Sequence, residues 1–190
     1  MIAQNWLDLS AERGPSNFDQ RHLLSLQTQY SSGVGVRGGA LLHGWKGAAF
    51  KGWTLISQLN AGSGLPATPV YAVAVRGTGV TGTIRPDTTG IPVQAAPPGR
   101  HLNPAAYTAP QPGQWGTAGR NSILGPSQFT LNASLGRTFA ENLDLRFDST
   151  NVLNHVTYPS WNTVVTNSQF GLPSTANAMR SLQATLRWRF

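Results

Sequence analysis

The sequence contains no cysteine, few charged residues and no long apolar run. The absence of cysteine excludes a disulfide framework, a thiolate metal site and a cysteine nucleophile. No stretch approaches the roughly 18 consecutive apolar residues of a transmembrane helix. The first residues form neither a basic nor an apolar segment, so no signal peptide is expected among them. Charged residues are 11% of the 190 residues, against about 25% in ordinary soluble domains. Glycine (21) and proline (13) recur too often for long coiled-coil heptads.

Five stretches alternate between apolar and polar residues, which is the pattern of strands with two unlike faces. They cover residues 21–31, 52–62, 128–139, 142–151 and 180–190. In the last stretch, the apolar positions that we expect to face lipid are Leu182, Ala184, Leu186, Trp188 and Phe190. The polar positions that we expect to face a wet lumen are Gln27, Gln58, Asn132, Asp144, Arg146, Asp148, Gln183 and Arg187.

The length of these stretches favours a membrane protein. Each has about 10 residues, whereas a soluble strand averages about 5–6 and a tilted membrane-spanning strand needs about 9–11. The apolar faces end in tryptophan, tyrosine and phenylalanine, as in the aromatic girdle of a barrel. We therefore predict an all-β fold, a segment of an antiparallel transmembrane β-barrel with five to six long strands. Residues 1–190 would form a single partial domain.

The connections between the stretches differ in length. Residues 63–127 and 152–180 are long, whereas the turn around residues 140–142 is tight. Outer-membrane barrels join their strands by short periplasmic turns and longer extracellular loops. With the two long segments outside, Phe190 finishes on the periplasmic side and residues 69–75 belong to an external loop.

Five strands cannot close into a barrel on their own. The smallest single-chain barrels have about eight strands, and open strand edges are not tolerated in lipid. We therefore expect this chain to be either the end of a longer barrel or one copy in an oligomeric barrel.

Several short motifs occur in an order that resembles one receptor family. They are ERGPSNFDQRH (12–22), GW (52–53), SGLP (63–66), LNPAAY (102–107), GRNSILGP (119–126), NVLNH (151–155) and the terminal phenylalanine. From about Leu9 onward the chain resembles the C-terminal barrel of TonB-dependent outer-membrane receptors. The Oar-like group, whose members carry a carboxypeptidase-regulatory-like domain, is the most similar branch.

The resemblance implies the wall and outer loops of a transporter, with no enzymatic role and no cofactor. It implies contact with outer-membrane lipid and with the barrel-assembly machinery, which would read the terminal Phe190. Members of the family also have a signal peptide, a regulatory domain and a plug, none of which is recognised in this sequence. The TonB system would act only through that plug, so this chain alone would not import a ligand. Nothing in the loops specifies the ligand.

A glycine motif and the histidines have alternative interpretations. Residues 33–38 fit the dinucleotide pattern G-x-G-x-x-G, but residues 39–44 are poor helix formers and no acidic residue follows the motif until Asp87. We therefore interpret the segment as a flexible periplasmic turn. His22, His43, His101 and His155 lie in separate segments without ligand spacing, and we expect them to bond at loop bases rather than to hold zinc.

The charged residues of the last strands also allow more than one interpretation. Asp144 and Asp148 flank Arg146 on one face, which indicates a neutralised lumen ladder rather than an acid–base pair. Arg187 and Arg189 lie opposite the aromatic residues of their strand, so they cannot clamp a nucleic acid that the aromatics stack. Arg137 interrupts the apolar face of its strand, near the predicted periplasmic end. An arginine on the lipid face costs only about 0–1 kcal/mol there.

Two alternatives from other classes remain. The first is a passive pore built from several copies of the chain. The second is a soluble, secreted β-sandwich adhesin, which would bury its apolar faces against each other.

Overall fold

A computed structural model describes residues 3–35, 37, 39–139 and 142–190. The chain divides into two compact units. The sheet unit comprises Leu23–Gly62, Phe129–Val156 and Ala178–Phe190. The loop unit comprises Met1–His22, Ser63–Gln128 and Thr157–Asn177. No helix in the described part of the chain is long and apolar enough to cross a membrane.

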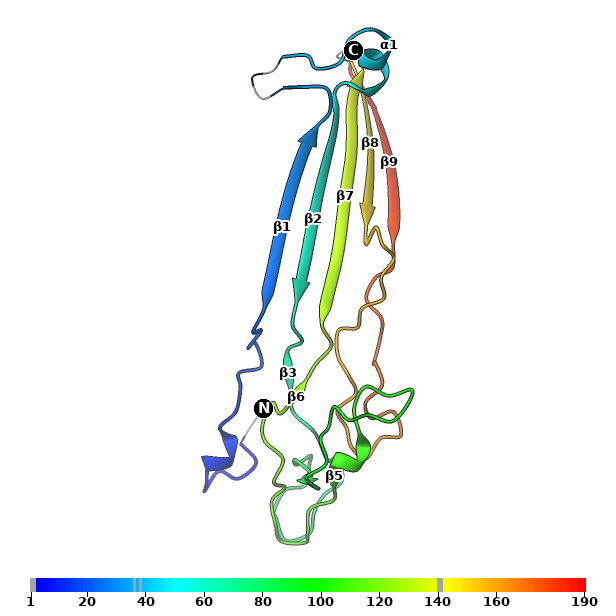
Figure 1. The fold of residues 1–190 in the computed structure, drawn as a ribbon. Helices are drawn as coiled ribbons and strands as arrows, with labels where there is room; N and C mark the ends of the chain where they lie inside the picture. The colour runs from blue at the N-terminus through cyan, green and yellow to red at the C-terminus, as the bar shows by residue number, and fades with distance from the viewer. Residues whose placement is uncertain (1–2, 36, 38, 140–141) are drawn as a thin grey trace. The chain divides into compact units, whose positions relative to one another are not determined.

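Five strands form the antiparallel sheet, in the order β1-β2-β7-β8-β9 (Figure 1). They are β1 (Leu23–Ser31), β2 (Trp53–Gly62), β7 (Gln128–Phe139), β8 (Leu143–Thr150) and β9 (Ser181–Trp188). The five alternating stretches of the sequence are thus confirmed as strands of one sheet. Within the described residues, β1 and β9 each leave one edge of the sheet open, so the sheet is not a closed barrel by itself.

The register gives the sheet one apolar and one polar face. Leu26 lies opposite Leu59, and Tyr30 lies opposite Leu55. Two positions further along each strand the side chains return to the same face. At the other side of the sheet, Leu145 of β8 lies opposite Leu186 of β9 and continues the apolar face. Many large apolar side chains of this face are exposed, among them Leu26, Tyr30 and Leu186, so no second layer of the described chain covers the face.

One connection differs from its predicted form. The segment between β1 and β2 contains a short helix, α1 (Gly44–Phe50), where we expected only a flexible turn. The poor helix formers of residues 39–43 are indeed outside the helix, and the helix begins at Gly44, whose φ is +62°. Of the glycine motif, Val36 and Gly38 lie outside the described residues, as do Ala140 and Glu141 of the tight turn.

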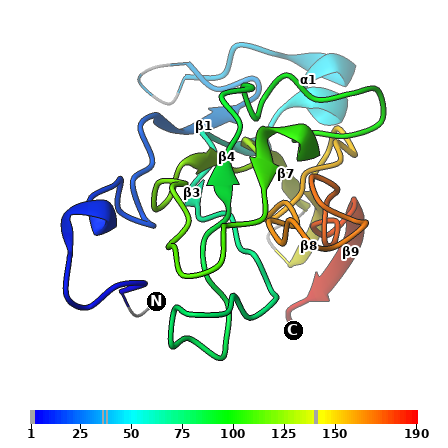
Figure 2. The ribbon, with the colours of Figure 1, turned by 90° about the horizontal axis from the view of Figure 1, so that it is seen from below.

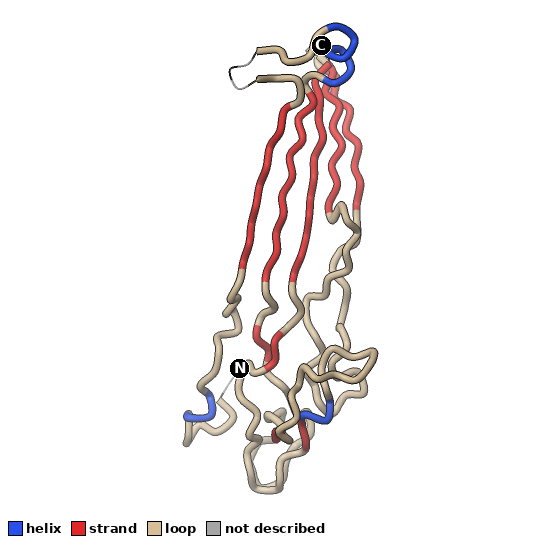
Figure 3. The backbone as a smooth tube through the Cα atoms, in the orientation of Figure 1, coloured by secondary structure: helices blue, strands red, loops and turns tan. Residues whose placement is uncertain are grey.

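The loop unit has its own small core although most of it is irregular (Figure 3). Its short elements are η1 (Ser10–Glu12), β3 (Pro66–Ala67), β4 (Asp87–Thr88), η2 (Pro104–Ala106), β5 (Tyr107–Thr108) and β6 (Ile123–Leu124). β3 pairs with β6, and β4 pairs with β5. Figure 2 shows β4 among the loops of this unit. The core residues are Leu102, Ala106, Tyr107, Ala118, Ile123 and Phe170. Residues 69–75 form no long strand and make only isolated bridges, as the loop interpretation predicts.

Two asparagines fix tight turns in the motifs that suggested the family. Asn151 has a φ of +48°, which asparagine tolerates better than most residues. Its side chain donates to the carbonyl of His155 at 2.9 Å and accepts from the His155 N–H at 3.0 Å. Asn121, with a φ of +53°, accepts from the Thr68 hydroxyl at 2.7 Å and donates to the Pro15 carbonyl at 2.7 Å. The motif with Asn151 therefore closes the C-terminal end of β8, and the motif with Asn121 joins distant loop segments.

Candidate functional site

The polar face of β7, β8 and β9 carries a ladder of charged and hydroxyl groups. Arg146 forms an ion pair with Asp148 at 2.8 Å, and its Nε donates to the Ser134 hydroxyl at 3.0 Å. Asp144 accepts from the Thr138 hydroxyl at 2.7 Å. Both carboxylates therefore have cationic or hydroxyl partners. The arrangement is that of a neutralised wall and leaves neither carboxylate positioned as a free acid or base.

The remaining predicted lumen residues occupy the same face by register. Gln27 lies directly opposite Gln58 across β1 and β2. Gln183 lies opposite Asp148, and Arg187 lies opposite Asp144. A hollow of about 470 Å³ on this part of the sheet is lined by residues that include Thr138, Asp144, Arg146, Thr185 and Arg187. The Asn132 side chain accepts from the backbone N–H of Asn151 at 3.0 Å, which connects the face to the turn after β8. The structure therefore places these residues on one face of the sheet. That this face contacts a lumen stays a prediction.

The apolar positions of the last strand lie together on the opposite face. Leu182, Leu186 and Trp188 are 74%, 68% and 66% exposed. Ala184 lies opposite Phe147, and Trp188 lies opposite Leu143. An exposed row of large apolar side chains is unfavourable in water, because its transfer to an apolar phase is worth about 25 cal/mol per Å². Their contact with lipid, and the role of Phe190 beyond the end of β9, stay predictions.

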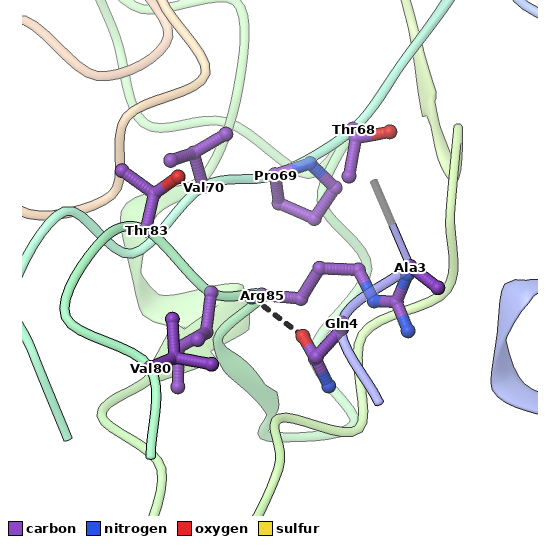
Figure 4. A pocket seen from close by; sticks show the side chains of 9 residues that line it. Ala3, Gln4, Thr68, Pro69, Val70, Val80, Thr83 and Arg85 are labelled. Atoms are coloured by element: carbon purple, nitrogen blue, oxygen red, sulfur yellow. Dashed lines mark hydrogen bonds between the residues drawn. The ribbon is translucent and has the colours of Figure 1, made fainter. Parts of the chain in front are cut away.

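The loop unit contains a pocket of about 540 Å³ (Figure 4). Most of its lining is apolar or hydroxyl-bearing: Ala3, Thr68, Pro69, Val70, Val80, Thr83 and Ile84. Gln4 and Arg85 supply the polar side chains. The Gln4 side chain accepts from the Arg85 N–H at 2.8 Å and donates to the Gly116 carbonyl at 3.1 Å. The pocket therefore suits a compact, largely apolar group that carries few polar atoms.

A largely buried ion pair lies beside this pocket, of which Arg85 is a lining residue. Arg85 Nη1 lies 2.9 Å from Glu12 Oε1, and the two side chains are 4% and 11% exposed. Arg85 Nη2 also donates to the Ala11 carbonyl at 3.2 Å. Burial raises the pKa of Glu12, but hydrogen bonds from Arg85 and from the Gln4 N–H, with the Arg85 charge, outweigh it and lower that pKa overall. Glu12 is therefore ionised at neutral pH and compensates the Arg85 charge.

The histidines do not converge. His101 stacks on Trp161 at 4.0 Å between ring centroids in the loop unit, whereas the His155 ring packs edge-on against Phe129 at 5.7 Å in the sheet unit. The backbone N–H of His22 donates to the Ser63 hydroxyl at 3.1 Å, and the His22 carbonyl accepts from the backbone N–H of Ser63 at 2.9 Å. His43 precedes α1 without a side-chain cap. No group of three potential metal ligands occurs among the residues that the structure describes.

Sequence reasoning missed two features of the molecule. The pocket and its ion pair join residues that are 73 positions apart, which no local pattern reveals. The second feature is the contact between Arg137 and α1, where Arg137 donates to the carbonyls of Ala48 and Ala49. A signal for this second contact was present, because Arg137 is the one charged residue on the apolar face of its strand.

A two-faced antiparallel sheet with an exposed apolar side and long loops defines a class of protein, the wall of a membrane β-barrel. Residues 1–183 match the family model described as an outer membrane beta barrel domain. The chain belongs to this family, and its place is the outer membrane. No curated protein and no solved structure matches the chain.

Proposed function

We propose that the chain forms part of the wall and the outer loops of a TonB-dependent transporter of the Oar-like group. The observation that carries this proposal is the two-faced sheet: exposed leucines and aromatics on one face, and a neutralised polar ladder on the other. The polar face suits a water-filled interior, and the apolar face suits lipid. The side chains supply wall and loop surface and have no catalytic role.

The loop unit supports a role in ligand entry. Its pocket is held open by buried contacts between distant segments rather than by a regular element, as is common in binding loops on a rigid scaffold. Transport would be energised only in a polypeptide that also carries a plug, through which the TonB system acts. The terminal Phe190 would be the contact for the barrel-assembly machinery.

The native polypeptide tests the TonB part of this proposal. Outer membranes of the source cells are digested, and peptides of the protein that contains these residues are sequenced by mass spectrometry. Peptides from a plug domain in the same polypeptide, and its cross-linking to the energy-coupling protein, are the expected result. A native protein without a plug, or one that never cross-links, would contradict the proposal.

A passive pore of several copies is the second candidate. The two open edges of the sheet, at β1 and β9, favour it, because each edge could pair with another copy. Such a pore would run on gels as an oligomer that dissociates on heating, and it would conduct ions in planar bilayers without any plug. The soluble β-sandwich is not supported, since the apolar face in the described chain lies open instead of packing against a second sheet.

A further inference from the structure

Helix α1 is attached to the apolar side of the sheet. Trp53 Nε1 donates to the Ala49 carbonyl at 3.1 Å, and Arg137 Nη1 donates to the same carbonyl at 2.6 Å. Trp53 lies two positions before Leu55, and Arg137 lies opposite Leu145, so both belong to the apolar face. The last turn of α1 is therefore held against the face that we assign to lipid, at the end of the sheet where β2 begins and β7 ends (Figure 1).

The surroundings of Arg137 indicate the depth of this end in the bilayer. Its guanidinium carbon lies 4.6 Å from the Phe139 ring centroid and 5.8 Å from that of Trp53. The rings and the helix carbonyls both stabilise the cation. A charged side chain on the lipid face is tolerated near the headgroups and is costly at the midplane. Aromatic rings on the same face are typical of the headgroup level.

Helix α1 and its flanking residues have the composition of a membrane-surface segment. Trp45 is 72% exposed, Phe50 is 57% exposed and the nearby Leu41 is 67% exposed. The chain has only two lysines, Lys46 within the helix and Lys51 directly after it. Large apolar groups beside lysines match a helix that lies in the interface, where the apolar groups enter the acyl boundary and the ammonium groups remain among the headgroups.

The described charged side chains of α1 and of its flanking segments have one sign. No acidic residue occurs between Asp19 and Asp87 in the sequence. Within β8, the described acidic residue closest to this end is Asp144, which belongs to the polar face and is already bound by Thr138 and Arg189. Among the residues that the structure describes, neither Lys46 nor Lys51 forms an ion pair, and both are exposed to an approaching anion.

We propose that α1 docks on the bilayer surface and binds phospholipid headgroups of net negative charge through Lys46 and Lys51. Trp45 and Phe50 insert between the acyl chains and anchor the end of the sheet at that depth. This inference rests on the proposed function, because it requires the apolar face of the sheet to contact lipid. It makes the connection between β1 and β2 a lipid-binding element instead of a passive turn.

Spin labels at single introduced cysteines test the docking, since this chain has no cysteine of its own. The full native polypeptide is reconstituted in vesicles of phosphatidylglycerol and in vesicles of phosphatidylcholine. Ala49→Cys reports the depth of α1, Leu26→Cys reports the apolar face, and Gln111→Cys in the loop unit is the water-exposed reference. Depth is measured from collisions with dissolved oxygen and with an aqueous nickel chelate.

In phosphatidylglycerol we expect the Ala49 label at phosphate depth, between the two reference labels. In phosphatidylcholine, or with Lys46→Gln and Lys51→Gln, the label moves toward water, and each neutralised lysine lowers the ratio of docked to undocked helix about fivefold. Arg76→Gln removes a cation from the loop unit and leaves the depth of the label unchanged.

The references separate the two ways in which the inference can fail. An Ala49 label in water, with the Leu26 label in hydrocarbon, overturns the docking of α1 and leaves the wall assignment intact. A Leu26 label in water overturns both the assignment of the sheet to a barrel wall and the docking of α1, which depends on it. An Ala49 label at equal depth in both lipids shows insertion without selection for anionic headgroups and overturns the proposed binding of anionic lipid by the lysines.

Discussion

Thr28 and Ser57 face each other across β1 and β2, with their hydroxyl oxygens 2.6 Å apart. They lie on the apolar face, between the Leu26–Leu59 and Tyr30–Leu55 pairs. In lipid a polar group has no water to bond, so it must find its partner within the protein. The hydroxyls of Thr28 and Ser57 satisfy each other in this way.

We predict that these two positions are coupled. Thr28→Val or Ser57→Ala alone leaves one hydroxyl unpaired and lowers the free energy of unfolding by about 0.5–1.5 kcal/mol. The double variant removes both hydroxyls and costs less than the sum of the single changes. Urea titration of the protein in lipid vesicles measures all three. Additive losses would show that the two hydroxyls do not depend on each other.

The Glu12–Arg85 pair should control the stability of the loop unit. Glu12→Gln leaves the buried Arg85 charge without its counter-ion, which costs about 3–5 kcal/mol for a buried pair. Faster backbone hydrogen exchange across residues 63–127 is the expected readout. The double change Glu12→Leu with Arg85→Met removes both charges and recovers much of the protection. Equal exchange in the wild type and in Glu12→Gln would refute this role.

The same pair predicts a pH dependence. The pKa of Glu12 is lowered in the folded protein below its ordinary value of 4.5. Such a group stabilises the fold fully above its unfolded pKa, and this contribution is lost as the pH falls through the folded pKa. Hydrogen-exchange protection of the loop unit should therefore decrease below about pH 4.5. In the Glu12→Gln variant, the protection of the loop unit should not decrease in this pH range. If the variant loses protection in the same way as the wild type, the acid sensitivity belongs to other groups.

Gly64 should tolerate no side chain. A Cβ at this position would lie 1.9 Å from the Gly125 carbonyl oxygen, so Gly64→Ala must displace the backbone beside β3 and β6. Overpacking of this kind costs about 1–3 kcal/mol. Gly82 is a matched control, since a Cβ there meets nothing within 4 Å. Limited proteolysis should cleave the loops of Gly64→Ala much faster than those of Gly82→Ala, and similar rates would contradict the close approach.

The strands could be predicted from the sequence because their signal is local. The alternation over residues 142–151 and 180–190 lies within two residues of the ends of β8 and β9. The register also brings Asp144, Arg146 and Arg187 to one face, because side chains alternate with a period of two.

The loop unit could not be predicted in the same way. Its core joins Leu102, Ile123 and Phe170, which belong to segments without periodicity. The buried pair of Glu12 and Arg85 and the pocket beside it depend on packing between these segments. Helix α1 has only seven residues, and its contacts with Trp53 and Arg137 stabilise it more than its glycine-containing sequence can.

Cysteine scanning of β9 is the most direct test of the membrane-wall account. Single cysteines replace residues 182–187 in turn, and each carries a spin label whose collisions with oxygen and with an aqueous nickel chelate are measured in lipid vesicles. The account predicts that labels at 182, 184 and 186 collide mainly with oxygen in the hydrocarbon, and that labels at 183, 185 and 187 collide mainly with the chelate. Labels that are equally accessible to the chelate on both faces would contradict the assignment of this sheet to a barrel wall.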